Sequence, residues 1–341
     1  MSITKPSSHP RIILSGFADE AAVHKTPVEQ FVAFASLGLQ YYSIRFVDLG
    51  DGVKNVMHLT VSDVQKLREY QNEYQMNVSS IGSPIGKVKL VDQEDGTKNR
   101  YVPFAQYLET EVVRACELAH AFEAKLIRGF SFYHPRGTDP KPYIPQVVDQ
   151  LGQIAEMCHR SDLTYGVEVE PNLVGENGYL LEEIWRQVSH PALTMVYDAA
   201  NLVVQGFTAT ELLEQFRLML PGLGWIHVKD YRNPVHVKGQ PVDEESLHHF
   251  VPCTQGDSGH EAIFRELRPA LPALKTNLKR RGIAGVFVDL EPHVKGGGQF
   301  GGFSGPDGLG VALRELCRML DYVDIDYHLR NFDDVCAARG F

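Results

Sequence analysis

Four short apolar runs in this sequence each end in an ionisable side chain, at Glu170, Asp198, His227 and Glu291. The runs read VEVEPN, VYDAAN, WIHVKD and VDLEPH. The first two intervals are 28 and 29 residues, and the third is 64. One strand–helix unit of a parallel sheet takes roughly 30 residues. We therefore expect these four groups to lie at similar heights on neighbouring strands, with a long loop before the last one.

Three carboxylates and one imidazole brought together this way repel one another unless positive charge lies among them. An oxygen-rich group with one nitrogen suits Mn²⁺, with Mg²⁺ or Co²⁺ as alternatives. The five cysteines are scattered and form no CxxC pair, which excludes an all-sulfur metal site. Taken alone, each carboxylate could equally be a helix cap or a solvated group. The metal site is predicted because all four occur together.

Two of the runs carry a second acidic residue, Glu168 and Asp289, two positions before the terminal one. Side chains alternate along a strand, so each of these shares a face with its neighbour, one layer deeper in the sheet. We expect the residue nearer the loop, Glu170 or Glu291, to be the metal ligand. Glu168 is then predicted to bind substrate or to support a ligand from below.

The elements that must position these groups alternate strictly between short apolar runs and longer amphipathic ones. Eight strand–helix units follow one another without a linker, which favours one α/β domain, a single (β/α)8 TIM barrel spanning 1–341. A doubly wound open sheet is the alternative. The barrel should cover about 11–323, with a C-terminal tail at 324–341. Extended loops are expected after the third, seventh and eighth strands.

Composition narrows the class of partner. The chain has 341 residues and a formal net charge of −10, which argues against a nucleic-acid or anionic-membrane surface as the main partner. No run reaches the length of a membrane-spanning helix, and the N-terminus lacks the apolar core of a signal peptide. Scattered cysteines are typical of reduced thiols. A cytoplasmic location is expected.

A glycine-rich loop follows the last run and spells Gly296-x-Gly298-x-x-Gly301. A dinucleotide fingerprint belongs to the first strand–helix turn of a unit that continues into another strand. Here no further strand follows, so we predict no nucleotide cofactor. The glycines are expected instead to let the backbone pass close to a bound substrate and to act as a lid.

The motifs VEVEPN, YDAAN, IHVKD and LEPH, with SGFADEA, IGSPIGK and IRGFSFYHP, resemble the xylose isomerase-like TIM barrels, the sugar (phosphate) isomerase/epimerase superfamily. The resemblance extends over nearly the whole chain. It implies that Glu170, Asp198, His227 and Glu291 bind Mn²⁺ or a similar ion.

Two branches of this superfamily are compatible with the sequence. Ketose 3-epimerases carry a further glutamate six residues after the first ligand, and Glu176 stands at that position in this chain. They also have Asp-x-x-His after the sixth strand, where this chain has Asn201. The chain more closely resembles the catalytic subunit of bacterial C-glycoside deglycosidases, which cleave 3-keto-glycosides by β-elimination. That resemblance implies a smaller β-sandwich partner subunit; a homo-oligomer is the alternative.

Both branches begin by removing a proton next to a sugar ketone, so a metal and a base are needed. By motif His134 is the predicted base, with Glu170 and Glu291 as the alternatives. The predicted substrate-binding residues are Lys87, Arg128, Glu168, Glu176, Asn201, Lys229 and His293. The substrate is expected to be a small sugar or keto-glycoside. A non-catalytic barrel subunit is the third possibility.

Overall fold

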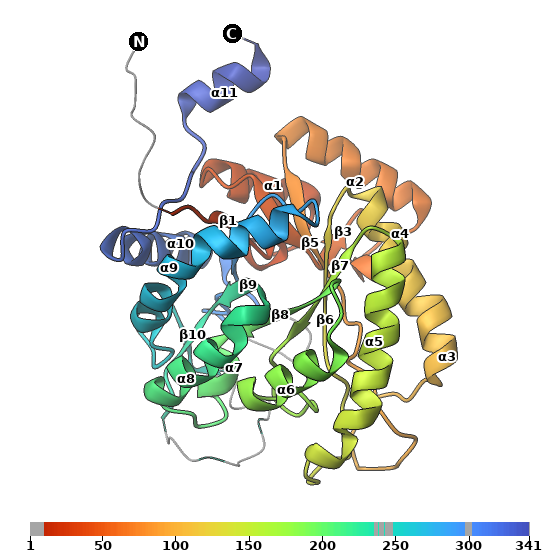
Figure 1. The fold of residues 1–341 in the computed structure, drawn as a ribbon. Helices are drawn as coiled ribbons and strands as arrows, with labels where there is room; N and C mark the ends of the chain where they lie inside the picture. The colour runs from red at the N-terminus through yellow and green to blue at the C-terminus, as the bar shows by residue number, and fades with distance from the viewer. Residues whose placement is uncertain (1–9, 235–237, 239–241, 243–247, 297–301, 341) are drawn as a thin grey trace.

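Eight parallel strands form the centre of the molecule in the computed structural model, which describes residues 10–234, 238, 242, 248–296 and 302–340. Their order is β1-β12-β9-β8-β7-β6-β5-β2, and a bridge between Phe17 and Ser43 joins the two edge strands. The sheet is a nearly closed barrel, which confirms the predicted TIM-barrel fold (Figure 1). The strands are β1 (Ile13–Gly16), β2 (Tyr41–Ile44), β5 (Asn77–Gly82), β6 (Leu126–Gly129), β7 (Thr164–Glu168), β8 (Leu193–Asp198), β9 (Leu223–Val228) and β12 (Phe287–Leu290).

Helices surround the barrel and bury their apolar faces against the strands (Figure 1). Among the described residues, no helix is both long and apolar enough to cross a membrane. The helices of the outer layer are α1 (Pro27–Ser36), α2 (Val61–Tyr74), α3 (Phe104–Tyr107), α4 (Val113–Ala121), α5 (Ile144–Arg160), α6 (Gly178–Val188), α8 (Ala209–Met219), α9 (His260–Lys279) and α10 (Gly305–Tyr322).

Local signals in the sequence set where several of these helices begin. Thr60 accepts a hydrogen bond from the backbone N–H of Asp63, and the Asp63 carboxylate accepts one from the backbone of Thr60. This reciprocal pair satisfies two N–H groups that have no partner within the helix. Thr208 and Glu211 repeat the arrangement at the start of α8. The helix starts are thereby fixed, and with them the points where the preceding loops must end.

Several short elements were not anticipated, and most of them lie on the side of the barrel where the strands end. They are η1 (Ala18–Ala21), the hairpin β3 (Phe46–Asp48) and β4 (Val53–Asn55), the pair β10 (Asp230–Tyr231) and β11 (Phe250–Val251), α7 (Ala199–Val203), and α11 (Phe332–Arg339) in the tail. β10 and β11 lie within the long loop that was predicted after the seventh strand. Within the predicted loop after the eighth strand, 297–301 lie outside the described residues, so the expected glycine lid is not described.

The C-terminal tail contacts the end of the barrel at which the strands begin. The backbone N–H of Arg330 donates to the carbonyl of Gly38 at 2.8 Å, and its guanidinium donates to the carbonyl of Tyr74 at 3.3 Å. Gly38 and Tyr74 lie at the carboxyl ends of α1 and α2. Because these helices run antiparallel to the strands, the tail packs away from the carboxyl ends of the strands.

The interior of the barrel is polar beneath its mouth. Ser43 donates to the Asp289 carboxylate at 2.5 Å, and the hydroxyls of Ser15 and Ser79 are 2.6 Å apart. All four side chains are buried. Burial raises the pKa of Asp289, although Ser43, Ser15 and His227 oppose this. Asp289 thus lies in the layer below Glu291, surrounded by hydroxyls.

A close contact between β6 and β7 generates a prediction about stability. A Cβ atom on Gly129 would lie 1.8 Å from the hydroxyl of Tyr165. That hydroxyl accepts from the backbone of Phe130 and donates to the carbonyl of Ile85, so it cannot move freely. We expect Gly129→Ala to lower the free energy of unfolding by about 2 kcal/mol, as overpacking does.

Gly152 provides the matched control, because it lies inside α5 and a Cβ there meets no atom closer than 4.0 Å. Gly152→Ala should raise the free energy of unfolding by about 0.5–1 kcal/mol, since alanine favours helices. Urea denaturation followed by circular dichroism measures both. Equal stability of the two variants would contradict the packing argument.

Candidate metal centre

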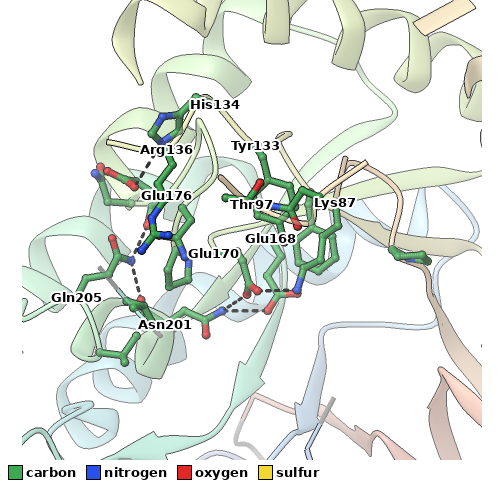
Figure 2. A pocket seen from close by; sticks show the side chains of 18 of the residues that line it. Lys87, Thr97, Tyr133, His134, Arg136, Glu168, Glu170, Glu176, Asn201 and Gln205 are labelled. Atoms are coloured by element: carbon green, nitrogen blue, oxygen red, sulfur yellow. Dashed lines mark hydrogen bonds and ion pairs between the residues drawn. The ribbon is translucent and has the colours of Figure 1, made fainter. Parts of the chain in front are cut away.

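A cavity of about 810 Å³ opens at the carboxyl ends of the strands (Figure 2). It is lined by all of the predicted site residues except Asp198 and His227, which lie buried beneath it. The segments that follow β2, β5, β6, β7, β8, β9 and β12 line it. The topology therefore gathers residues far apart in the sequence into one pocket.

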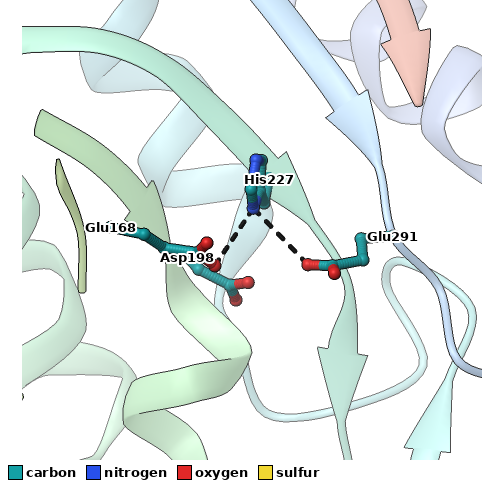
Figure 3. A group of neighbouring side chains, drawn as sticks. All are labelled: Glu168, Asp198, His227 and Glu291. Atoms are coloured by element: carbon teal, nitrogen blue, oxygen red, sulfur yellow. Dashed lines mark hydrogen bonds and ion pairs between the residues drawn. The ribbon is translucent and has the colours of Figure 1, made fainter. Parts of the chain in front are cut away.

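Four buried side chains from successive strands converge at the base of this pocket (Figure 3). Each offers one ligand atom, and all four atoms lie within 4.8 Å of one another. The residues are Glu168, Asp198, His227 and Glu291. We call them the four-residue cluster.

The histidine sits between two glutamates of the cluster. His227 Nδ1 lies 3.1 Å from Glu168 Oε1 and 3.4 Å from Glu291 Oε2. The ring is held from behind, because Trp225 Nε1 lies 3.2 Å from its Nε2 and Phe17 packs edge-on against it at 5.3 Å. Its Nδ1 is therefore directed toward the carboxylates.

The structure brings Glu168 into the cluster in place of Glu170, the residue expected from the sequence. Glu170 instead pairs with Lys87, whose Nζ lies 2.6 Å away, and accepts from Asn201 at 2.8 Å. Asn201 also donates to Glu168 at 3.3 Å. Glu170 therefore lines the pocket beside the cluster and is not among the four converging groups.

The physical reason lies in where β7 ends. Its ladder with β8 pairs Glu168 with Val196, and the strand finishes there. Beyond that point the chain turns into a loop through Pro171 and no longer follows the barrel wall. Alternation along a strand predicts facing side chains only while the strand continues. Extrapolating it by two residues to Glu170 therefore placed the carboxylate too far along the chain.

Asp198 has two functions in the structure. Its Oδ1 accepts from the backbone N–H groups of Ala200 and Asn201, so it caps α7. Its Oδ2 is buried and accepts no hydrogen bond of acceptable geometry, although Lys229 Nζ lies 2.9 Å away. The helix-cap and ligand interpretations of this aspartate are thus compatible, because each uses a different oxygen.

Three buried cations surround the cluster. Lys229 also lies 3.2 Å from Glu291 Oε2, and Arg128 lies 3.3 Å from Glu168. Arg45, which the sequence did not single out, donates to Glu291 at 2.8 Å. Arg45 follows β2 in the run YYSIRF, so the strand-end rule that found the other residues would also have found it.

Burial and neighbouring charges shift the pKa values of these groups in opposite directions. Burial alone would raise the pKa of Glu168, but His227 and Arg128 outweigh it and lower the pKa to about 2. Burial likewise opposes protonation of His227, but Glu168 and Glu291 raise its pKa to about 10. Burial raises the pKa of Asp198 to about 6, with Lys229 opposing. These shifts favour ionised Glu168 and Glu291, and Lys229, Arg45 and Arg128 supply positive charge beside them, while Nε2 of His227 accepts a hydrogen bond from the Trp225 indole N–H.

The cluster has the composition and geometry of a divalent-metal site. Three carboxylates and one imidazole are hard-to-borderline donors that suit Mn²⁺, Mg²⁺ or Co²⁺. The buried Oδ2 of Asp198, which faces the Lys229 ammonium at 2.9 Å, is the kind of oxygen that binds a cation. These four residues therefore fit a metal ion.

His293 lies close to the cluster and is firmly anchored. Its Nδ1 lies 2.7 Å from Glu20 Oε1, and its backbone N–H donates to the other oxygen of Glu20 at 2.9 Å. Its Nε2 lies 3.9 Å from Glu291 Oε1. The backbone of His293 has a φ of 53°, a left-handed conformation that Glu20 helps to hold. Sequence reasoning did not find Glu20, which is buried in η1.

His134 occupies another part of the pocket. Its Nε2 is 4.0 Å from Glu176, and its Nδ1 lies 3.2 Å from the hydroxyl of Thr138. Figure 2 shows His134 and Glu176 together on one side and Lys87 with Glu170 on the other. His134 is therefore not among the groups that contact the cluster.

The fold and the four-residue cluster define a TIM barrel with a candidate metal centre in its mouth. A sequence profile of the xylose isomerase-like TIM barrel family matches residues 31–271. The chain belongs to this family, and the resemblance noted in its strand-end motifs is confirmed at that level. Comparison with curated proteins finds no match.

Several solved structures share the fold. A probable 3-DHS dehydratase from Bacillus anthracis, AsbF, is 14% identical with a TM-score of 0.60, covering 90% of this chain and 98% of its own. A D-allulose 3-epimerase from Methylomonas sp. is 12% identical with a TM-score of 0.60, covering 91% and 99%. A xylose isomerase-like TIM barrel protein from Mycobacterium smegmatis, in complex with magnesium, is 16% identical with a TM-score of 0.58, covering 93% and 97%. At these identities the likeness establishes the fold.

The finding that Glu168, and not Glu170, belongs to the cluster can be tested with a matched control. Glu168→Gln should weaken Mn²⁺ binding by more than about tenfold, because it removes a charged donor from the cluster. Glu170→Gln removes the same charge two residues away and should leave the affinity nearly unchanged. Titration calorimetry and metal analysis of purified protein measure both. A larger loss in the Glu170 variant would show that Glu170 is the ligand after all.

Proposed function

We propose that this protein is a divalent-metal-dependent enzyme that removes a proton next to the ketone of an oxidised sugar. The leading reaction is cleavage of 3-keto-glycosides, C-glycosides among them, by β-elimination. The four-residue cluster at the base of a large pocket is the observation that carries this proposal. Mn²⁺ is the expected ion, and a protein with the same fold that was solved in complex with magnesium supports a divalent cation.

The size of the pocket supports a substrate with two parts. A cavity of about 810 Å³ lies near the upper end of the range that holds drug-sized ligands, and a single sugar ring is smaller than those. The inner part carries the cluster and its cations. Aromatic side chains line the cavity as well, among them Phe46, Tyr133 and Phe207. A sugar toward the cluster and an aromatic aglycone toward the mouth would fill both parts.

A bound metal would supply a Lewis acid that polarises the ketone. The side chains of the protein would stabilise the charge that develops and accept the proton. As the proton leaves C2, negative charge develops on the ketone oxygen, and the cations Arg45, Arg128 and Lys229 lie around the place where it forms. The electron pair then expels the aglycone from C1 and leaves a double bond between C1 and C2. The departing aglycone takes up a proton.

His293 is the better placed of the two pocket histidines to accept the C2 proton. Glu20 accepts a hydrogen bond from Nδ1, so the proton of a neutral ring resides there and Nε2 keeps its lone pair. That Nε2 lies beside Glu291 of the cluster. His134, the base predicted from the motif, pairs with Glu176 instead. We therefore assign the base to His293 and place His134 against the outer part of the substrate.

Ketose epimerisation is the second candidate. Glu168 and Glu291 both belong to the cluster, as a mechanism with two exchanging glutamates requires. Counted from Glu168, however, the position six residues on is Val174, which is buried and apolar. Asn201 stands where those enzymes carry a histidine, and here it holds Glu168 and Glu170. These departures rank epimerisation below cleavage.

A β-sandwich partner subunit and a homo-oligomer both remain predictions.

The reaction is tested by supplying a 3-keto-glucoside with a phenolic aglycone and following aglycone release by chromatography. Release should require Mn²⁺, stop when EDTA is added and be absent in Glu168→Gln. Interconversion of free ketoses is measured in parallel on the same preparation. Ketose turnover without aglycone release would replace the leading proposal with epimerisation. If the protein shows neither activity and binds no metal, the result would favour a non-catalytic barrel.

The assignment of the base has its own test. His293→Asn should reduce kcat by about 10²–10⁴-fold, the usual contribution of a general base, while metal content stays constant. His134→Asn should chiefly raise KM. Exchange of the C2 proton with deuterated solvent, followed by NMR, reports the proton-transfer step directly. Loss of exchange in the His134 variant alone would return the role to His134.

A further inference from the structure

Two cations at the outer part of the pocket stand apart from the others. Lys98 and Arg136 both line the cavity and are exposed. Neither forms an ion pair with any carboxylate in the part of the chain that the structure describes. Figure 2 shows the Arg136 side chain extending from the His134 side into the pocket.

The other pocket lysines and arginines are already compensated. Arg45, Arg128 and Lys229 pair with carboxylates of the cluster. Lys87 pairs with Glu170, and Lys238 pairs with Glu211. The uncompensated positive charge of the described pocket is therefore concentrated at Lys98 and Arg136.

Both cations are attached to one organised loop junction. Asp95 pairs with Lys89 at 2.8 Å and accepts from the backbone and hydroxyl of Thr97. It also accepts from the backbone N–H of Arg136 at 3.3 Å. The carboxylate thus fixes the backbone next to Lys98 and at Arg136, while Lys89 neutralises its charge. The backbone segments that carry the two cations are thus held near each other, and Asp95, which positions them, pairs with Lys89.

We propose that Lys98 and Arg136 bind an oxyanion on the part of the substrate that lies farthest from the metal centre. Resting on the proposed function, this makes the preferred substrate a keto-glycoside whose aromatic aglycone carries a carboxylate. A guanidinium fork and an ammonium suit such a group, because both donate charge-assisted hydrogen bonds to its oxygens. Aromatic side chains of the same pocket, Tyr133 and Phe207 among them, offer flat apolar surface for the ring that carries it.

Equilibrium binding tests the site without requiring turnover. The probes are 4-hydroxybenzoate and its neutral isostere 4-hydroxybenzamide, titrated into the Mn²⁺-loaded protein by calorimetry. The wild type should prefer the carboxylate by about tenfold at low salt, and the preference should shrink as salt screens the charges. Phenyl phosphate serves as a further arm, which distinguishes a carboxylate site from a phosphate site.

The paired substitution Lys98→Gln and Arg136→Gln should abolish the preference while leaving 4-hydroxybenzamide binding unchanged. Lys279→Gln with Arg280→Gln removes the same charge from the exposed end of α9, outside the pocket, and should keep the preference. Equal melting temperatures confirm that both proteins fold.

Three results would overturn the inference. The carboxylate preference could persist in the Lys98 and Arg136 variant, which would place recognition at the metal. Both probes could weaken equally in that variant, which would indicate a general effect on the pocket. Tighter binding of phenyl phosphate than of 4-hydroxybenzoate would reject the carboxylate assignment. None of these results depends on whether the enzyme cleaves glycosides, so failure here is distinguishable from failure of the proposed reaction.

Discussion

Buried carboxylates in the mouth of the barrel need positive charge among them, and much of the surrounding structure meets that need. Glu168, Asp198 and Glu291 are buried within a few ångströms of one another. Removing such charges from water is costly unless each has a close, well-oriented partner. Lys229, Arg45 and Arg128 provide that compensation around the cluster. A divalent ion would provide it more compactly, and Oδ2 of Asp198, which now faces Lys229, is one of the oxygens suited to binding it.

The compensating groups come from opposite ends of the chain, so the site depends on barrel closure. Arg45 follows β2 and donates to Glu291, which is 246 residues away in sequence. Glu20, in η1 after β1, holds His293 after β12. β12 pairs directly with β1, and the bridge between Phe17 and Ser43 brings β2 alongside. The last strand can present its side chains in the right orientation only when the first two are in place.

The pocket separates into two electrostatic environments, and this bears on which reaction the barrel performs. Near the cluster every cation has a carboxylate partner, as suits a site that must hold a metal and stabilise a developing oxyanion. Toward the mouth, Lys98 and Arg136 lack such partners among the described residues. The proposed glycoside substrate would extend from the inner environment into the outer one.

The sequence by itself determined the eight strands, the barrel and three of the four cluster residues, because Asp198, His227 and Glu291 lie at the ends of strands marked by local apolar runs. Only the tertiary structure decided that Glu168 joins them instead of Glu170, and that His293, not His134, is the pocket histidine beside Glu291. Periodicity is a local property and identifies the face of a strand. The point at which a strand stops, and the direction of the loop beyond it, depend on contacts with distant segments. Those contacts cannot be read from spacing along one chain.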